Sequence, residues 1–290
     1  MKLGIGTAQF GMPYGVANKG NVCTQGELLN ILKYAQGQKI HAIDTAPSYG
    51  NAQLRLGSTG CMSNFRVITK VSKTDIQTSE DYRPDDTVRL IKRSLDELSI
   101  EKCYGILCHD TDTLTTPHGR ALLSHLASLK QDGYFKKVGV SIYDLSDVNL
   151  VLRANEIDIV QLPLNLFDQR FFRSGAISKL KDNDIEIHIR SAFLQGLLLM
   201  PLSDLKSKRP DAVPHVETLQ KTAHDLGQTP LSLALGYLSS IDEIDLVIVG
   251  VNNQWHLTQI ITASKASIDP KEVSSLALNN PNLIDPRRWE

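Results

Sequence analysis

The sequence predicts one α/β domain, a barrel of eight parallel strands surrounded by helices, and two observations support this prediction. Eight short apolar runs, rich in aliphatic and β-branched residues, are spread along the 290-residue chain. Amphipathic stretches of helical period lie between them, and no linker or shift in composition divides residues 1–290. Alternation of strand and helix favours a parallel sheet, and eight such units favour its closure into a (β/α)8 TIM barrel.

The strands are predicted where a run of four to six mostly apolar residues empties into a polar loop. In chain order they are Leu3–Thr7, Ile40–Asp44, Phe65–Lys70, Tyr104–Cys108, Val138–Ser141, Ile157–Leu162, Ile185–Arg190 and Leu246–Val249. The alternative is an open, doubly wound sheet. It is disfavoured because Gly4-x-Gly6 lacks the third glycine of a dinucleotide-binding turn and does not open a helix.

Helices are predicted where apolar residues recur at spacings of three and four. Thr24 is a suitable N-cap for the first of them, and Gly133 is a natural residue to follow the third. The segments are Thr24–Gln36, Arg83–Leu98, Thr116–Asp132, His215–Leu226 and Leu231–Ser239. Lys206–Pro214, rich in charge and proline, is predicted as a loop that covers part of the barrel mouth. The tail from Asn279 to Glu290 is also predicted to be irregular.

The composition narrows the class of protein. Hydrophobic residues make up 41% and charged residues 22%, and the formal net charge is −1, which is ordinary for a globular protein. No basic block points to nucleic acid or to a membrane surface, and no apolar run has the length of a signal peptide or a membrane span. The four cysteines lack the spacing of a metal site. We therefore expect a cytoplasmic protein without a metal, and the sequence carries no signal for an oligomeric state.

Four polar side chains follow the predicted strands and point to chemistry. Asp44 and Tyr49 follow the second strand, Lys70 closes the third, and His109 follows the fourth. Each alone has an ordinary structural explanation, such as capping a turn or facing solvent. The carboxyl ends of parallel barrel strands converge on one mouth, so the four are expected to meet there. An acid, a phenol, an amine and an imidazole so gathered are typical of a site for proton transfer.

With these residues the chain resembles the aldo-keto reductase family, from Gly4 to about Leu276. The four side chains correspond in order to the family's Asp, Tyr, Lys and His. Val138-Gly139-Val140-Ser141 and Gln161 resemble the contacts to the nicotinamide carboxamide, and residues 191–198 resemble the pyrophosphate loop. The resemblance implies reversible reduction of a carbonyl by a nicotinamide cofactor. It also implies a cofactor site made of Gly6, Thr7, Asp44, Ser141, Gln161, Arg190, Ser191, Phe193, Gln195, Gly196, Gly250, Val251, Asn252 and His256.

The expected roles follow from charge and proton affinity. Tyr49 is the general acid, and the ammonium of Lys70 is expected to lower its pKa. Asp44 keeps Lys70 charged, and His109 donates a hydrogen bond to the carbonyl oxygen. The substrate is expected to be a small polar aldehyde or ketone, sugar-derived ones included, and its product an alcohol. The residues assigned to it are Gln9, Tyr14, Tyr49, His109 and Asn165.

Three departures from the family pattern bear on the cofactor. Ile142 stands where the family often has Asn, so one carboxamide contact is missing. Arg190 stands where many members stack an aromatic ring, although a planar guanidinium can also stack. His256 lies near the position of the arginine that binds the 2′-phosphate of NADP. NADPH is therefore expected as the cofactor, and NADH remains possible.

Two other functions stay open at this point. One is a nicotinamide-binding regulatory subunit of the same fold, which would bind the cofactor much better than it turns over. The other is a barrel lyase in which Lys70 forms a Schiff base with its substrate.

Overall fold

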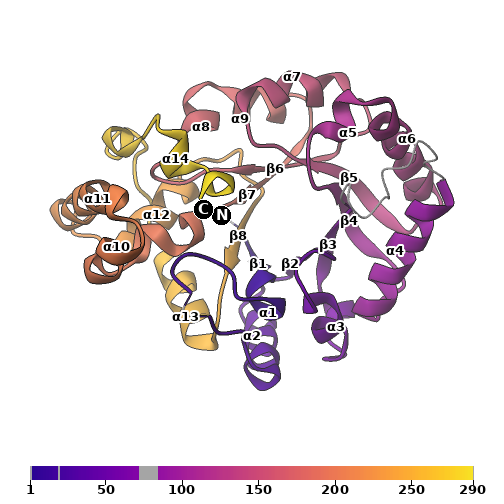
Figure 1. Cartoon of the computed structure of the whole chain (residues 1–290), viewed down its shortest axis with the longest axis horizontal. Coiled ribbons are helices and arrows are strands. Elements are labelled where there is room, and N and C mark those ends of the chain that lie inside the picture. Colours follow the sequence, from indigo (N-terminus) through magenta and orange to yellow (C-terminus); the bar gives the residue numbers. More distant parts are fainter. Residues whose placement is uncertain (1, 19, 72–83, 290) are drawn as a thin grey trace.

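Eight parallel strands close into a barrel in the computed structural model, which describes residues 2–18, 20–71 and 84–289 (Figure 1). They pair in chain order and the last pairs with the first, so the predicted barrel is confirmed and the open sheet is wrong. The strands are β1 (Leu3–Gly6), β2 (Ala42–Asp44), β3 (Arg66–Val71), β4 (Cys103–Cys108), β5 (Phe135–Ser141), β6 (Ile159–Pro163), β7 (Glu186–Arg190) and β8 (Leu246–Gly250).

Helices surround the barrel (Figure 1). Thr24 and Thr116 act as N-caps, accepting hydrogen bonds from the backbone N–H groups of Glu27 and Gly119. The α-helices are α1 (Ala8–Gly11), α2 (Gln25–Gly37), α3 (Ala52–Gly57), α4 (Pro84–Leu98), α5 (Asp112–Thr115), α6 (Pro117–Gln131), α7 (Leu145–Arg153), α8 (Arg170–Arg173), α9 (Ala176–Lys181), α10 (Leu202–Lys208), α11 (Val213–Asp225), α12 (Pro230–Ser239), α13 (Gln254–Ala263) and α14 (Pro281–Ile284). The predicted start of α4 at Arg83 lies outside the described residues. Among the described residues, no helix combines the length and the apolar character that crossing a membrane requires.

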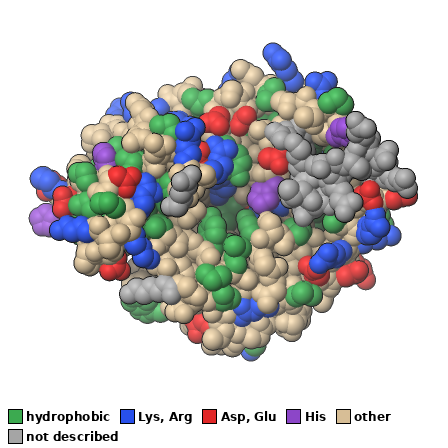
Figure 2. All heavy atoms as spheres, viewed as in Figure 1, with side chains coloured by type: hydrophobic (Ala, Val, Ile, Leu, Met, Phe, Trp, Pro, Cys, Tyr) green, Lys and Arg blue, Asp and Glu red, His purple; other side chains and the backbone are tan. Residues whose placement is uncertain are grey.

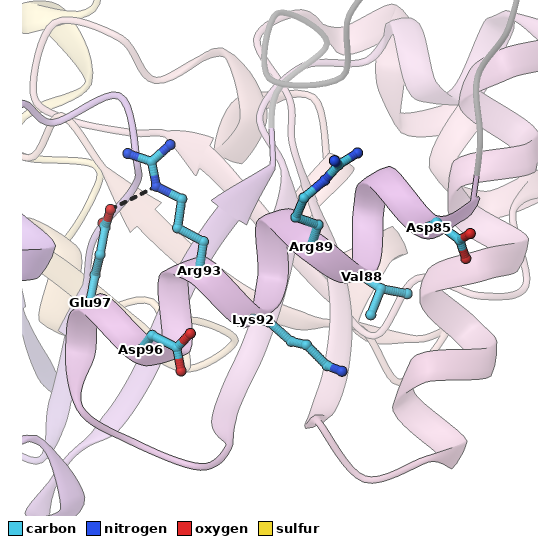
Figure 3. Close-up of a pocket in the computed structure, with 7 residues that line it drawn as sticks. All are labelled: Asp85, Val88, Arg89, Lys92, Arg93, Asp96 and Glu97. Carbon is cyan, nitrogen blue, oxygen red and sulfur yellow. Dashed lines mark hydrogen bonds and ion pairs between the residues drawn. The ribbon is translucent and has the colours of Figure 1, made fainter.

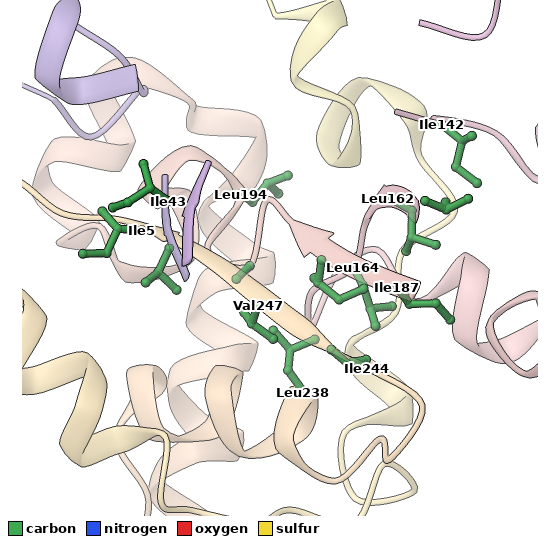
Figure 4. Close-up of a cluster of buried hydrophobic side chains, with 14 of the residues drawn as sticks. Ile5, Ile43, Ile142, Leu162, Leu164, Ile187, Leu194, Leu238, Ile244 and Val247 are labelled. Carbon is green, nitrogen blue, oxygen red and sulfur yellow. The ribbon is translucent and has the colours of Figure 1, made fainter. Parts of the chain in front are cut away.

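The core has two parts. Outward-facing strand residues pack against the helices, as Ile5, Ile43 and Val247 do in the cluster that also contains Leu238 of α12 (Figure 4). A smaller cluster fills the inside of the barrel and consists of Ala42, Ile68, Leu107, Ile159 and Leu246. The inside of the barrel is therefore packed, and a ligand has to bind at an end of it.

The segment predicted as a loop over the mouth is largely helical. Lys206–Pro214 contains the end of α10, a 3-10 turn at Pro210–Ala212 and the start of α11. Two of its three basic residues hold neighbouring segments, because Lys208 Nζ donates to Val16 O at 2.8 Å and Arg209 Nη2 donates to Asn282 O at 3.0 Å. The prediction of a loop was wrong because contacts with these distant segments stabilise helix there.

Candidate active site

A cavity of about 710 Å³ opens at the carboxyl ends of the strands. The segment after β1, the loop after β7 and the start of α13 border it. In the space-filling view the hollow lies near the centre of the face, with Lys and Arg side chains along one border and a histidine beside it (Figure 2). This is the end of a barrel at which strand-end side chains can meet around one ligand.

A buried ion pair lies directly beneath this cavity. The Lys70 ammonium donates to both carboxylate oxygens of Asp44, at 2.7 Å to Oδ1, and to Thr45 O at 3.1 Å. Gln161 Nε2 also donates to Asp44 Oδ1, at 2.9 Å. Lys70 and Asp44 are only 1% and 3% exposed. A charge pair so removed from water is retained only with close geometry and further hydrogen bonds, which this one has.

Tyr49 and His109 lie over the pair. The Lys70 ammonium is 5.0 Å from the centre of the Tyr49 ring. The rings of Tyr49 and His109 meet edge to face, with their centres 6.4 Å apart. The structure thus brings the four strand-end side chains together, as the sequence analysis expected of parallel strands in a barrel.

Burial and charge act against each other on the two titrating groups. Burial alone would lower the pKa of Lys70, but the Asp44 carboxylate and Tyr49 outweigh it, so the pKa is raised and Lys70 stays protonated. Burial raises the pKa of Tyr49, and Lys70 only partly opposes this. The ammonium of Lys70 thus acts in the expected direction, but desolvation, which the sequence analysis did not consider, outweighs it and the pKa of Tyr49 is raised. Tyr49 remains a phenol at neutral pH and can donate a proton.

Two glycines hold Tyr49 in place. A Cβ atom at Gly11 would lie 1.9 Å from Tyr49 O and 2.5 Å from Ala52 N. Gly50 has a positive φ of 59°, and a Cβ there would lie 2.4 Å from Gly11 O. The segment after β1 therefore touches the backbone that carries Tyr49, an approach that only glycine permits.

We predict that Gly11→Ala lowers both stability and turnover. The added methyl group has to push the Tyr49 backbone away, which we expect to cost about 1–3 kcal/mol, as other overpacking does. Denaturant unfolding measures the first effect and the steady-state rate the second. Gly26→Ala, on α2 with nothing within 4 Å of the added atom, is the matched control and should change neither.

The loop after β7 has an unusual backbone. Ser191, Leu194, Gln195 and Gly196 have φ values of 59°, 49°, 55° and 90°. Such left-handed residues outside glycine are strained, and runs of them can point backbone N–H groups at an anion. Gly196 is further required by packing, because a Cβ there would lie 2.6 Å from Ala17 Cβ. The loop is thus a candidate cradle for a phosphate group.

Three buried polar atoms in the cavity lining have no partner within the described part of the chain. They are Ser141 Oγ, Arg190 Nε and Asn252 Oδ1. Ser141 ends β5, Arg190 ends β7, and Asn252 follows β8. Buried polar atoms are normally hydrogen-bonded. Their spread over three strand ends fits a ligand that is extended along the mouth and carries polar groups at several points.

Most residues assigned from the sequence line this one cavity. They are Gly6, Thr7, Gln9, Tyr14, Asp44, Tyr49, His109, Ser141, Gln161, Arg190, Ser191, Phe193, Gln195, Gly196, Gly250, Asn252 and His256. Lys70 lies below the lining, and Val251 is 1% exposed and outside it. Asn165 is also outside it. Its side chain is fully buried, donates to Ser191 O and accepts from the N–H groups of Phe167 and Asp168. Asn165 therefore supports the β7 loop and does not face the cavity.

The sequence analysis missed a stack of three side chains at the mouth. The guanidinium of Arg190 lies 4.0 Å from the centre of the Tyr143 ring, and that of Arg287 lies 3.9 Å from the same centre. Arg287 belongs to the C-terminal tail, so the tail reaches the mouth at this stack. The only local signal was that Tyr143 follows a strand end closely.

A second hollow lies along α4 and is about 530 Å³ in volume (Figure 3). It is lined by Asp85, Val88, Arg89, Lys92, Arg93, Asp96 and Glu97. Its charged side chains pair along the helix surface, as Arg93 and Glu97 do at 2.9 Å, which is usual for a solvated helix face. In the described ranges no group of three or more His, Cys, Asp or Glu side chains is placed to hold a metal.

Comparison with known proteins agrees with this geometry. Residues 2–278 match the model of the Aldo/keto reductase family. The chain is 22% identical to aldo-keto reductase YhdN of Bacillus subtilis, over 98% of this chain and 92% of that protein. It is 31% identical to D-arabinose 1-dehydrogenase of Saccharomyces cerevisiae, over 41% of this chain and 37% of that protein. The holo form of aldo-keto reductase AKR11C1 from Bacillus halodurans has the same fold, with a TM-score of 0.79 and 18% identity over 100% of this chain and 95% of that one.

Proposed function

Because the chain belongs to the aldo/keto reductase family, whose members are oxidoreductases that use nicotinamide cofactors, we propose that it reduces a small polar aldehyde or ketone to an alcohol with NADPH. The observation that supports this most is the position of the buried Lys70–Asp44 pair beneath Tyr49. These residues adjoin the cavity that contains the three unpartnered polar atoms. A proton donor and an extended polar ligand site therefore share one space.

Tyr49 supplies the proton in the proposed reaction. When bound, a nicotinamide cofactor would supply a hydride to the carbonyl carbon, which would leave negative charge on the carbonyl oxygen. The Tyr49 phenol, kept protonated by burial, donates its proton to that oxygen. Lys70 stabilises the tyrosinate that remains, and Asp44 holds the ammonium in place. His109, beside Tyr49, orients the carbonyl by a hydrogen bond.

The cavity lining fits the cofactor along its length. The pairing of Ser141 with Gln161 and the unpartnered Ser141 Oγ support a contact with the carboxamide. The left-handed loop from Ser191 to Gly196 suits a pyrophosphate. Asn252 and His256, at the start of α13, suit the adenosine end.

His256 sets the choice between the two nucleotides in this proposal. Burial lowers the pKa of His256, so the imidazole is neutral at pH 7 and gives the 2′-phosphate no charged partner. NADPH and NADH are therefore expected to bind with similar affinity at neutral pH. The affinity for NADPH alone should rise as pH falls below 6.5, through the lowered pKa of His256, because protonation creates the missing charge.

We predict that His256→Arg strengthens NADPH binding about tenfold or more at pH 7.5 and leaves NADH binding unchanged. The reason is the gain of a charge-assisted hydrogen bond to the 2′-phosphate. Titration of intrinsic fluorescence with each nucleotide measures both constants. Gln254→Arg adds the same charge at an exposed position of the same helix, outside the cavity lining. An equal gain in that variant would show that the effect is not local to the site.

Two observations support a sugar-derived substrate. The cavity presents Gln9, Tyr14, Tyr49 and His109 to a ligand, a polar set that suits hydroxyl groups. The relative D-arabinose 1-dehydrogenase is named for a sugar substrate. We propose small polyhydroxy aldehydes and ketones as the first compounds to assay.

A Schiff-base reaction at Lys70 is disfavoured by the ion pair. An amine attacks a carbonyl only when it is neutral, and the pKa of Lys70 is raised by Asp44 and Tyr49. The regulatory alternative predicts a different result, because a regulatory subunit would bind the cofactor without turning over a carbonyl substrate.

The proposed function is tested by mixing the protein with NADPH and a panel of polar aldehydes and ketones, following loss of NADPH absorbance. We expect carbonyl-dependent oxidation of the nucleotide with an alcohol as product. Nucleotide binding without oxidation across the panel would favour a regulatory subunit. Borohydride trapping of a substrate adduct on Lys70 would favour the lyase.

A further inference from the structure

Arg190 brings a permanent positive charge into the cavity wall without a carboxylate partner in the described ranges. Its Nη2 donates to Ile142 O at 3.1 Å and its Nη1 to Ser191 Oγ at 3.5 Å. Its Nε is buried and has no partner there. Lys70, by contrast, is paired with Asp44. A guanidinium has five N–H donors in a fixed fork, so Arg190 has donors to spare.

The guanidinium is held in position by aromatic stacking. One face of Arg190 lies against Tyr143, and the same ring carries Arg287 of the tail. Arg287 is neutralised by Asp285 at 2.6 Å and Asp144 at 3.5 Å. The pKa of Asp285 is lowered by Arg287 and also by the charge of Arg190, but Arg190 forms no direct ion pair with a carboxylate in the described ranges. A cation fixed in this way is preorganised for an anion and loses little freedom on binding it.

Tyr14 lines the same cavity as Arg190, Tyr49 and His109. Burial raises the pKa of the Tyr14 hydroxyl, and the charges of both Arg190 and Lys70 oppose that rise. Tyr14 in turn affects the pKa of Tyr49. The Tyr14 hydroxyl is thus within electrostatic reach of the proton donor on one side and of the guanidinium on the other. A small molecule with its carbonyl at Tyr49 would have both Tyr14 and Arg190 in the wall of the same cavity.

We propose that Arg190 and Tyr14 form a subsite for an anionic group of the substrate, a carboxylate or a phosphate, so that the protein prefers carbonyl compounds that carry such a group. This inference rests on the proposed function for the position of the carbonyl. The hydrogen bond to Ile142 O turns the guanidinium toward the residue after Ser141, at the end of β5. An anion bound by Arg190 would therefore lie near the end of the cavity where the carbonyl reacts. The loop after β7 would bind the cofactor's pyrophosphate.

The test uses pairs of carbonyl compounds in which one member carries an anionic group and the other is neutral. The first pair is 4-carboxybenzaldehyde and its neutral isostere 4-formylbenzamide. The second is glyceraldehyde 3-phosphate and glyceraldehyde, which distinguishes phosphate from carboxylate. We expect kcat/KM to favour the anionic member of at least one pair about ten- to a hundredfold, the range of a charge-assisted hydrogen bond. Arg190→Met should abolish this preference, Arg190→Lys should keep part of it, and Tyr14→Phe should reduce it.

Two further measurements separate the possible roles of Arg190. The resemblance places Arg190 in the cofactor site, whereas a substrate subsite predicts the same Kd for NADPH in the wild type and Arg190→Met. Arg120→Met, at an exposed position of α6, is the control for loss of a charge. The inference is overturned if the wild type has no preference in either pair. It is also overturned if Arg190→Met weakens NADPH binding and slows both members of a pair equally, because Arg190 would then serve the cofactor.

A binding experiment keeps the inference testable without turnover. Terephthalamate carries the same carboxylate as 4-carboxybenzaldehyde. It has an amide in place of the aldehyde, so it is not a substrate for carbonyl reduction. Calorimetry should show that it binds the wild type with NADPH present and binds Arg190→Met at least about tenfold more weakly. If no carbonyl is reduced but this dependence on Arg190 holds, the proposed function fails and the anion subsite stands. If the two proteins bind terephthalamate equally, the subsite is wrong.

Discussion

Tyr49→Phe is expected to lower kcat for carbonyl reduction by about 10²- to 10⁴-fold, the usual contribution of a positioned general acid. The variant removes one oxygen and keeps the ring, which packs beside His109 and over Lys70. NADPH binding should therefore not change. Steady-state rates and a fluorescence titration on the same preparation measure the two effects.

The pH profile gives a second reading of the same residue. Carbonyl reduction requires the protonated phenol, which is present below the pKa of Tyr49 and lost as pH rises through it. Burial raises that pKa above its ordinary value of 10.0. Reduction should thus show no loss that depends on Tyr49 below about pH 10. A Tyr49-dependent loss near neutral pH, or a Tyr49→Phe variant with full activity, would contradict the role of general acid.

Lys70→Met is expected to have the largest effect on stability, about 3–5 kcal/mol. The variant leaves the Asp44 carboxylate buried, with Gln161 as its remaining side-chain donor in the described part of the chain. Because the pKa of Lys70 is raised, the stabilisation it gives is fully present below its ordinary pKa and is lost only as pH rises through the higher folded value. Denaturant unfolding at neutral pH measures the free energy of unfolding.

A matched surface pair provides the control for this prediction. Lys181 pairs with Asp245 at 2.7 Å, but the two side chains are 38% and 30% exposed. Lys181→Met should therefore cost at most about 1 kcal/mol. The double variant Asp44→Asn/Lys70→Met removes both charges and should recover part of the loss. Equal losses for Lys70→Met and Lys181→Met would contradict the claim that burial makes the first pair costly to break.

The barrel could be predicted from the sequence because its signals are local. A parallel strand covered on both faces needs a nearly continuous apolar run, and a helix on the outside needs an apolar stripe. Both were readable. The ends of the strands differed from prediction by one to three residues, as at β2 and β5, because pairing with the neighbouring strand decides where a strand begins and ends.

The gathering of Asp44, Tyr49, Lys70 and His109 was also predictable, since it follows from strand ends and barrel closure alone. The sign of the Tyr49 pKa was not, because it depends on how deeply the hydroxyl is buried. Asn165 was assigned to the substrate from its place after a strand. In the structure the Asn165 amide donates to Ser191 O, after β7, and accepts from the backbone N–H of Phe167.

Long-range contacts account for the other omissions. Gly11 and Gly50 are required only because two loops 39 positions apart touch. The stack of Arg190, Tyr143 and Arg287 needs the tail to fold back over the mouth. Tail residues also bind the segment after α10, where Arg209 stacks on Trp289 at 4.5 Å. None of these contacts leaves a periodic signal in the sequence.

The most direct test of the central claim is a titration of the purified protein with NADPH and NADH, followed by fluorescence and calorimetry. The cavity, with the unpartnered Ser141 Oγ and Asn252 Oδ1, predicts saturable one-to-one binding of at least one of the two. Ser141→Ala and Asn252→Ala should each weaken that binding, because each removes a predicted hydrogen bond to the nucleotide. A folded protein that binds neither nucleotide, or binds one without any dependence on Ser141 and Asn252, would contradict the account.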